Sequence, residues 1–254
     1  MLEVLADEGE LSLSEISRRV ALSPSTVARA LDTLRRRGYV FESTATGLYR
    51  MGVRTFEVGS SFISQTQLHQ VARPLMQTLV DEVQDTATLA VLEGSESVHV
   101  DQVVGQYLVR RFNGIGKRTP LHSTSSGKVL LAWQPEERVR ALLGDAPLVR
   151  YTVNTLPDTD AVLRELANVR RLGYSVDNEE RELGVRCLAA PVRDHTDEVI
   201  ASLSLSTTSA RLPDGRLAEL AVPLLRTSGE ISRQLGSGRR DGRWGERTSD
   251  EPVA

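Results

Sequence analysis

Over residues 1–54 the apolar positions follow a helical spacing three times and then change to the alternating spacing of strands. The predicted helices end at Gly9, Val20 and Arg37, and the predicted strands cover 39–41 and 48–51, with a polar turn between them. Two helices joined by a few residues form a helix-turn-helix unit, whose second helix enters the major groove of DNA. The pattern therefore predicts a winged helix-turn-helix, a mainly helical DNA-binding domain completed by a β-hairpin.

Local signals support these helix boundaries. Ser12 and Glu15 have the spacing of a capping box ahead of the second helix. Ser23 stands where an N-cap residue is needed, and Pro24 follows at the first helical position. Gly38 is placed to end the third helix. The second and third helices are therefore expected to begin and end close to these residues.

Beyond residue 54 the pattern predicts a longer series of mixed elements. Helical spacing indicates a linker helix over 55–66 and an amphipathic helix over 67–83, which Pro74 could kink or restart. The remaining pattern predicts strands over 87–92, 97–104, 174–177, 185–193 and 199–206, and helices over 123–133, 135–143, 159–172 and 213–235. An antiparallel sheet with flanking helices makes this an α+β domain.

The chain is therefore predicted to hold two domains and a tail, and its 254 residues suffice for them. The predicted parts are a winged helix-turn-helix over 1–54, a linker helix over 55–68, an α+β domain over 69–236 and a tail over 237–254. The tail is rich in Gly, Arg and Ser and has no apolar periodicity, so we expect it to be disordered.

The net charge of −3 hides an uneven distribution. Between Ser14 and Arg54 eight arginines stand against three acidic residues, a balance of +5, whereas residues 69–236 hold 19 basic and 22 acidic residues, a balance of −3. The average acidity argues against nucleic acid, but the division by domain reverses that interpretation, because a basic module suits DNA. An arginine-rich helix face that is merely solvated remains the alternative.

Composition also narrows the setting of the protein. Cys187 is the only cysteine, so no intramolecular disulfide can form and a disulfide-stapled secreted scaffold is excluded. No apolar run approaches the ~20 residues that span a bilayer, and residues 1–7 lack a basic leader. We therefore expect a cytoplasmic protein with no membrane partner and no cofactor.

The third predicted helix carries chemistry suited to DNA. Hydroxyls and backbone N–H groups at its start can hold a phosphate, and Arg29, one turn further on, can bind guanine through two hydrogen bonds. Other arginines can neutralise phosphates. The candidate DNA-binding residues are Ser23, Ser25, Thr26, Arg29, Arg35, Arg36 and Arg50. A plain helix-start role for Ser25 and a solvated surface role for the arginines are the alternatives.

These segments resemble the DNA-binding module of the IclR family of bacterial transcription regulators, and later segments are similar to the family's effector domain. The matching segments are Leu11–Val20, Leu22–Leu31, Leu34–Val40, Pro120–Ala132, Gly173–Glu180, Gly184–Val192 and Ala201–Ser206. The resemblance covers about residues 1–236. Family members usually carry a longer first helix, so we expect either an upstream start or a shortened dimer-forming helix.

The resemblance implies a GAF-like fold for the second domain, which binds small molecules between its sheet and its helices. It assigns the effector-binding residues by position, matching relatives that sense small 2-oxo acids: Ser125 and Ser126 through backbone N–H groups, and Asp177, Cys187, Ser204 and Ser206. Independently of the family, a helix start rich in hydroxyls can hold an anion, and Ser204 and Ser206 lie on one face of their strand. The alternatives are a solvated strand face for these two serines, a small core residue for Cys187 and a loop acid for Asp177.

The expected function is a DNA-binding transcription regulator, a repressor rather than an activator. It is expected to bind operator DNA as a homodimer or homotetramer under the control of a small carboxylate such as a 2-oxo acid. A metal-responsive regulator of the same fold stays open, although His69 and the other histidines are scattered along the chain. So does an enzyme with a Cys187 nucleophile and His99, His122 or His195 as base, but no catalytic motif accompanies them.

Overall fold

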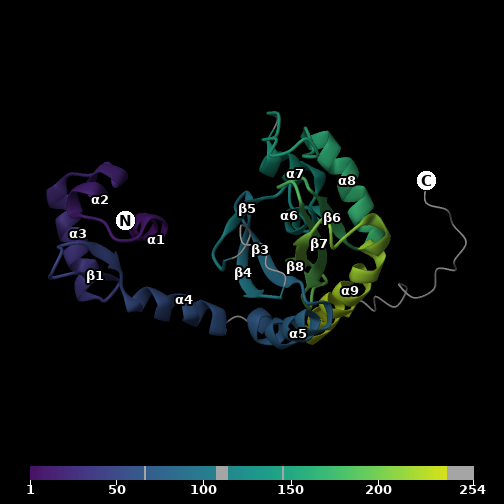
Figure 1. Ribbon diagram of the computed structural model, residues 1–254, viewed down its shortest axis with the longest axis horizontal. Coiled ribbons are helices and arrows are strands. Elements are labelled where there is room, and N and C mark those ends of the chain that lie inside the picture. The colour runs from purple at the N-terminus through teal and green to yellow at the C-terminus, as the bar shows by residue number, and fades with distance from the viewer. Residues whose placement is uncertain (66, 107–113, 145, 239–254) are drawn as a thin grey trace, which may run out of the picture. The chain divides into compact units, whose positions relative to one another are not determined.

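The computed structural model describes residues 1–65, 67–106, 114–144 and 146–238 (Figure 1). Residues 239–254, most of the segment expected to be disordered, lie outside the described residues. The chain forms two compact units, Met1–Thr66 and Gln67–Ala254. Each unit has its own hydrophobic core.

The first unit is the predicted winged helix-turn-helix. Its elements are α1 (Leu2–Glu8), α2 (Leu13–Val20), α3 (Pro24–Arg36), β1 (Val40–Glu42), β2 (Tyr49–Met51) and α4 (Val53–Gln65). Strands β1 and β2 pair antiparallel and form the hairpin that was expected. Ile16 of α2 packs with Val27 and Leu31 of α3 in a small core. This packing fixes α3 by its inner face and leaves its outer face exposed.

The predicted helix ends are confirmed. Ser12 and Glu15 form the capping box of α2, and Ser23 caps α3 ahead of Pro24. Gly38, two residues after the end of α3, has a φ of 77°. This left-handed conformation is strained for residues with a Cβ atom, so a glycine suits the turn from helix to strand.

The second unit is built on one antiparallel sheet of six strands. Its strands are β3 (Thr86–Glu93), β4 (Glu96–Val103), β5 (Arg118–Pro120), β6 (Ser175–Asn178), β7 (Val185–Arg193) and β8 (Val199–Thr208), in the order β5-β4-β3-β8-β7-β6. Its helices are α5 (Gln67–Val83), α6 (Ser125–Ala132), α7 (Glu136–Leu143), α8 (Thr159–Leu172) and α9 (Leu217–Gln234). The predicted α+β class with an antiparallel sheet is confirmed.

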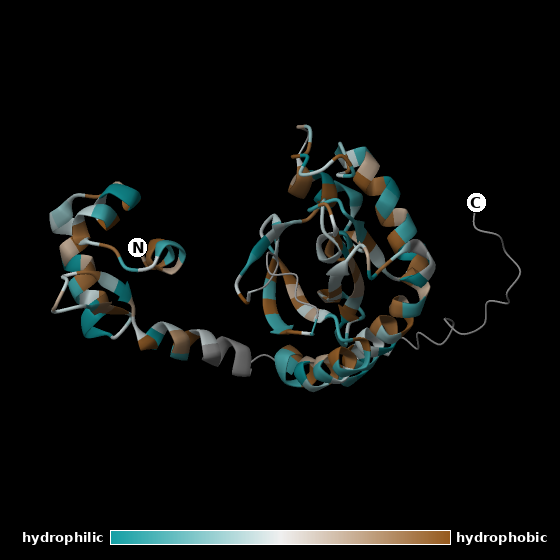
Figure 2. Cartoon of the chain, in the orientation of Figure 1, coloured by the Kyte–Doolittle hydropathy of each residue, from teal (hydrophilic) through white to brown (hydrophobic). Residues whose placement is uncertain are grey.

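The two faces of the sheet are covered by different helices (Figure 1). Helices α5 and α9 bury the face that carries Leu89, Leu188 and Leu203. Helix α6 packs on the opposite face and is itself backed by α8. Figure 2 shows hydrophobic and hydrophilic residues alternating along the helices, as expected for helices with one buried face.

Several details differ from the sequence-based predictions. The linker helix α4 begins at Val53 rather than at residue 55, and some strand ends are shifted by one or two residues. Strand β5 was not predicted, because three residues that end in proline are too few to show an alternating pattern. Helix α6 begins at Ser125 rather than at residue 123, since Thr124 takes the N-cap position. The last helix begins at Leu217 after a single 3-10 turn over Asp214–Arg216, and not at residue 213.

Candidate functional site

The outer face of α3 is polar and exposed. Val27 and Leu31 are fully buried in the core, whereas Ser25, Thr26 and Arg29 are exposed on the other side of the helix. The N-cap Ser23 accepts the Thr26 N–H at 3.3 Å. The predicted hydroxyls therefore gather at the N-terminus of α3, where the helix dipole favours a negatively charged group.

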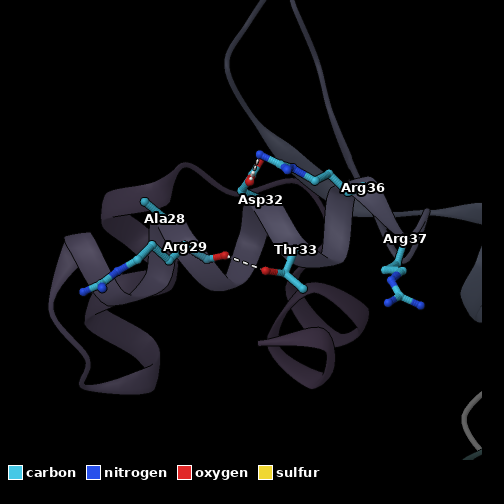
Figure 3. Close-up of a pocket in the computed structure, with 6 residues that line it drawn as sticks. All are labelled: Ala28, Arg29, Asp32, Thr33, Arg36 and Arg37. Carbon is cyan, nitrogen blue, oxygen red and sulfur yellow. Dashed lines mark hydrogen bonds and ion pairs between the residues drawn. The ribbon is translucent and has the colours of Figure 1, made fainter.

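Arg29 is the arginine of α3 best placed to contact a partner. Its Nε donates to the Ser25 carbonyl at 3.3 Å, and among the described residues it makes no ion pair. Figure 3 shows its side chain extending away from the helix axis. A shallow groove of about 660 Å³ runs along this face, lined by Ala28, Arg29, Asp32, Thr33, Arg36 and Arg37.

Arg35 and Arg36 are less available than the sequence suggested. Both guanidinium groups lie 2.8 Å from the carboxylate of Asp32, and their hydrogen bonds lower the pKa of that carboxyl. Arg50 of β2 lies over the ring of Phe41, 4.4 Å from its centroid. These arginines are exposed, so exchanging such contacts for phosphates costs little.

Sequence reasoning missed Thr33 and left Arg37 out of the candidate set. Both line the groove beside Arg29 (Figure 3). Thr33 lies one helical turn after Arg29 and donates its hydroxyl to the Arg29 carbonyl at 3.0 Å. The spacing of four residues could have identified it, because positions i and i+4 share one face of a helix.

Three of the predicted effector residues form one row across the sheet. Asp177 of β6 pairs with Cys187 of β7, which pairs with Ser206 of β8. Directly paired residues point to the same side of a sheet, and Cys187 donates to the Ser206 Oγ at 3.4 Å. Ser204 lies two residues from Ser206, on the same side and buried. The alternatives of a solvated strand face for Ser204 and of a loop position for Asp177 are therefore wrong.

The first turn of α6 brings Ser125 and Ser126 to this side of the sheet. Both residues are buried, and Ser175 of β6 donates to the Ser125 carbonyl at 2.6 Å. Thr124 caps the helix by accepting the Gly127 N–H at 3.1 Å. The N–H groups of Ser125 and Ser126 belong to the first turn, where the helix itself offers no acceptor.

A buried ion pair supports this region, and sequence reasoning missed it. Lys128 of α6, only 1% exposed, donates to the Glu180 carboxylate and to the Val176 carbonyl, both at 2.5 Å. Asp177 lies beside the pair and accepts the Glu180 N–H at 2.8 Å. Burial, and then the charge of Glu180, raises the pKa of Asp177 to about 7. Lys128 is one of only 2 lysines among 31 basic residues, a signal that could have drawn attention to it.

The geometry supports neither an enzyme with a Cys187 nucleophile nor a metal-responsive regulator. Burial raises the pKa of the Cys187 thiol far above its ordinary value, so the thiol stays protonated and poorly nucleophilic. His122, one of the candidate bases, has its Nε2 at 2.9 Å from the Val149 carbonyl rather than beside the thiol. Within the described ranges, no group of His, Cys, Asp and Glu side chains gathers as metal ligands. In the same part of the chain, no helix is long and apolar enough to cross a membrane.

Comparisons with known proteins agree with both halves of the chain. Residues 1–42 match the model of the IclR helix-turn-helix domain, and residues 60–233 match that of the bacterial transcriptional regulator IclR C-terminal domain. The chain is similar to the HTH-type transcriptional regulator XynR of Escherichia coli, with 37% identity over 89% of this chain and 90% of that protein. It is also similar to the transcriptional repressor IclR of the same species, with 34% identity over 93% of this chain and 87% of that protein.

A solved structure shows the same fold. It is an IclR homolog from Microbacterium hydrocarbonoxydans in complex with 4-hydroxybenzoate, with a TM-score of 0.79, 29% identity, and coverage of 89% of this chain and 91% of that chain. The winged helix-turn-helix and the α+β domain with its antiparallel sheet are thus the two parts of a known architecture. The chain belongs to the IclR family of transcriptional regulators.

Proposed function

We propose that this regulator is a repressor that binds operator DNA through α3 and the β1–β2 wing, and that a small carboxylate changes this binding. The effector in this proposal lies between the first turn of α6 and the residues Asp177, Cys187, Ser204 and Ser206. The observation that carries it is the meeting of a helix N-terminus with buried hydroxyls on one side of the sheet. A carboxylate can accept hydrogen bonds from both.

The DNA half of the proposal rests on the outer face of α3. Arg29 can donate two hydrogen bonds to guanine in the major groove, and the hydroxyls of Ser25 and Thr26 can bind a backbone phosphate. Arg37 carries a further positive charge on the same face, and Arg50 does so on the wing. In this arrangement Arg29 reads the sequence, while the other arginines contribute mainly to affinity.

A homo-oligomer is favoured by the surface of α4. Val53 and Phe56 are 72% and 73% exposed in the single chain. Large apolar side chains of this kind are usually covered in a working protein. Two copies of the winged unit would bind two operator half-sites, because a two-fold axis of the protein imposes the same symmetry on its DNA.

The repressor role and the effector class draw support from relatives. One relative of comparable length is a transcriptional repressor, and the IclR homolog of known structure holds 4-hydroxybenzoate, which is a carboxylate. An effector can shift operator affinity only if it binds one conformation of the regulator better than another. The proposal therefore requires that effector and operator change each other's affinity by the same factor.

A gel-shift assay on the DNA upstream of the protein's own gene tests this function. Intact protein is expected to retard that fragment at low salt, and pyruvate or glyoxylate is expected to change the fraction retarded. The double variant Ser204→Ala/Ser206→Ala should bind the fragment as the native protein does but lose the response. Absence of a retarded band would refute the DNA half, and an unchanged response of the double variant would refute the effector half.

A further inference from the structure

Several buried polar side chains lie on the α6 side of the sheet without a hydrogen bond. Ser97 of β4, Thr119 of β5 and Ser202 of β8 have buried hydroxyls with no partner among the described residues. The same holds for Nδ1 of His99 on β4. Ser97 and Ser202 are fully buried, and Thr119 and His99 are 3% and 8% exposed. A buried polar group without a partner costs free energy, so a cluster of them calls for an explanation.

The strand register gathers these four side chains in one area. Ser97 pairs directly with Thr119. His99 pairs with Ala90 of β3, and Ala90 pairs with Ser202. Paired positions share one face, so all four polar side chains lie on the α6 side of the sheet. His99 and Ser202 flank Ala90 on β3, whose methyl group is small, and Ser97 has Leu92 as its partner on β3.

This cluster adjoins the predicted effector residues and extends beyond them. Asp177, Cys187 and Ser206 lie on β6, β7 and β8, and Ser202 lies on β8 two residues from Ser204. His99, Ser97 and Thr119 lie on β4 and β5, on the other side of β3. From β8 to β4 there are two strand spacings, or about 10 Å. A two- or three-carbon acid held at Ser206 is too short to reach Ser97 as well.

A surface groove includes one member of the cluster in its lining. It has a volume of about 530 Å³ and is lined by Lys117, Thr119, Tyr151, Thr152, Arg181, Glu182 and Leu183. Thr119 belongs to both the groove lining and the cluster. Arg181 lies over the ring of Tyr151 at 3.7 Å from its centroid, which holds a positive charge at the groove wall.

The cluster suits neutral hydroxyl groups rather than a second carboxylate. Three of its four members are hydroxyls, which can both donate and accept. Burial lowers the pKa of His99 to about 4, so its imidazole is neutral near pH 7. The ring has a hydrogen bond to the backbone of Gly114, and Nδ1 is the ring nitrogen that can bind a ligand hydroxyl. No charged side chain belongs to the cluster itself.

We propose that Ser97, His99, Thr119 and Ser202 form a second ligand subsite that binds hydroxyl groups on the chain of a carboxylate effector. The proposal rests on the proposed function, since the carboxylate end of the ligand occupies the site at α6 and Ser206. The effector is then a hydroxylated acid that extends across β3, and a short 2-oxo acid fills only half of the site.

A matched series of acids tests the subsite on the full-length protein by isothermal titration. Gluconate and galactonate carry hydroxyls along the chain, and 2-hydroxyhexanoate has the same number of carbons and the same head group without the distal hydroxyls. Pyruvate is a three-carbon 2-oxo acid, which is too short to reach the cluster. At least one of the two sugar acids should bind at least about tenfold more tightly than 2-hydroxyhexanoate, which is the effect of one or two hydrogen bonds.

Two variants locate the effect. Ser97→Ala and Thr119→Val should each weaken binding of the sugar acid by about tenfold and leave pyruvate binding unchanged. Thr119→Val should also keep or raise the Tm of the ligand-free protein, because it removes a buried group that has no partner. Ser228→Ala, which removes a buried hydroxyl from α9 on the other side of the sheet, is the control and should not change ligand affinity.

Each result bears on the proposal. Binding of pyruvate without tighter binding of either sugar acid would overturn the subsite and leave the proposed function standing. Unchanged sugar-acid affinity in both Ser97→Ala and Thr119→Val would also overturn it. If none of the acids binds while operator DNA is still retarded, both the subsite and the carboxylate effector are wrong.

Discussion

The two candidate sites hold their polar residues in opposite ways. On α3 the hydroxyls and arginines are exposed and the apolar residues face the core. In the second unit, hydroxyls, a carboxyl and a lysine are buried between the sheet and α6, while the opposite face of the sheet is mainly apolar and has Asp101 of β4 buried against Arg73 and His69 of α5. A surface site can bind a large charged partner at little cost to stability. A buried polar site must be supported by hydrogen bonds and charges, and it suits a small ligand.

The largest expected effect comes from breaking the buried pair of the second unit. Lys128→Met leaves the Glu180 carboxylate buried and without its counter-charge, and we expect a loss of about 3–5 kcal/mol in the free energy of unfolding. Urea unfolding followed by the fluorescence of Trp133, which follows α6 directly, measures it.

The double variant Lys128→Met/Glu180→Leu is the control for that prediction. It removes both charges, so most of the lost stability should return. A loss below about 1 kcal/mol in the single variant would show that the ion pair is solvated. The polar groups at α6 would then be no more buried than those on α3, which would contradict the comparison above.

The next largest effect concerns α3, where a substitution should weaken DNA binding without lowering the free energy of unfolding. Arg29→Ala should weaken binding to the operator by about 10- to 100-fold, while the free energy of unfolding changes by less than about 0.5 kcal/mol. Titration of operator and of unrelated DNA, together with a thermal melt, measures both quantities.

Arg37→Ala is the matched control, since it removes the same charge from the end of α3. It should weaken binding to operator and unrelated DNA alike and lower the slope of affinity against salt by about 1. Equal behaviour of the two variants would mean that Arg29 contacts only phosphate.

The smallest expected effect is a pH dependence confined to the second unit. The Asp177 carboxyl faces Lys128 from α6, Cys187 from β7 and Glu180 from its own loop, and its pKa is raised to about 7. A negatively charged effector should bind better when this carboxyl is protonated, so its affinity should fall by up to about tenfold from pH 6 to pH 8. The Asp177→Asn variant should bind the effector with the same affinity at pH 6 and at pH 8.

The same pKa fixes the sign of a stability change. Between the ordinary value of 3.8 and about 7 the folded protein holds a proton that the unfolded chain has lost. The free energy of unfolding therefore falls as the pH rises through this interval, and the full loss is reached above pH 7. Asp177→Asn should remove this contribution, whereas Ser206→Ala should keep it. A native affinity that does not depend on pH would contradict the protonation of Asp177.

Local rules were enough for the first unit. The capping box at Ser12, the N-cap at Ser23 and the end of α3 near Gly38 involve residues close in sequence, and each was predicted where it occurs. The orientation of Arg29 follows from the same helical period. The pairing of Arg35 and Arg36 with Asp32 is also local, but it depends on side-chain conformations that the pattern does not contain.

The sequence by itself determined the order of the elements, the two-domain class and the outer face of α3, because each depends on spacing within a few turns of chain. Only the tertiary structure decided which polar residues of the second unit meet. Ser206 pairs with Cys187 and Lys128 meets Glu180 across about 20 and about 50 residues of chain, and Ser97 joins Ser202 only through β3. Strand order and burial make these contacts, and neither can be obtained from the spacing of residues along one strand.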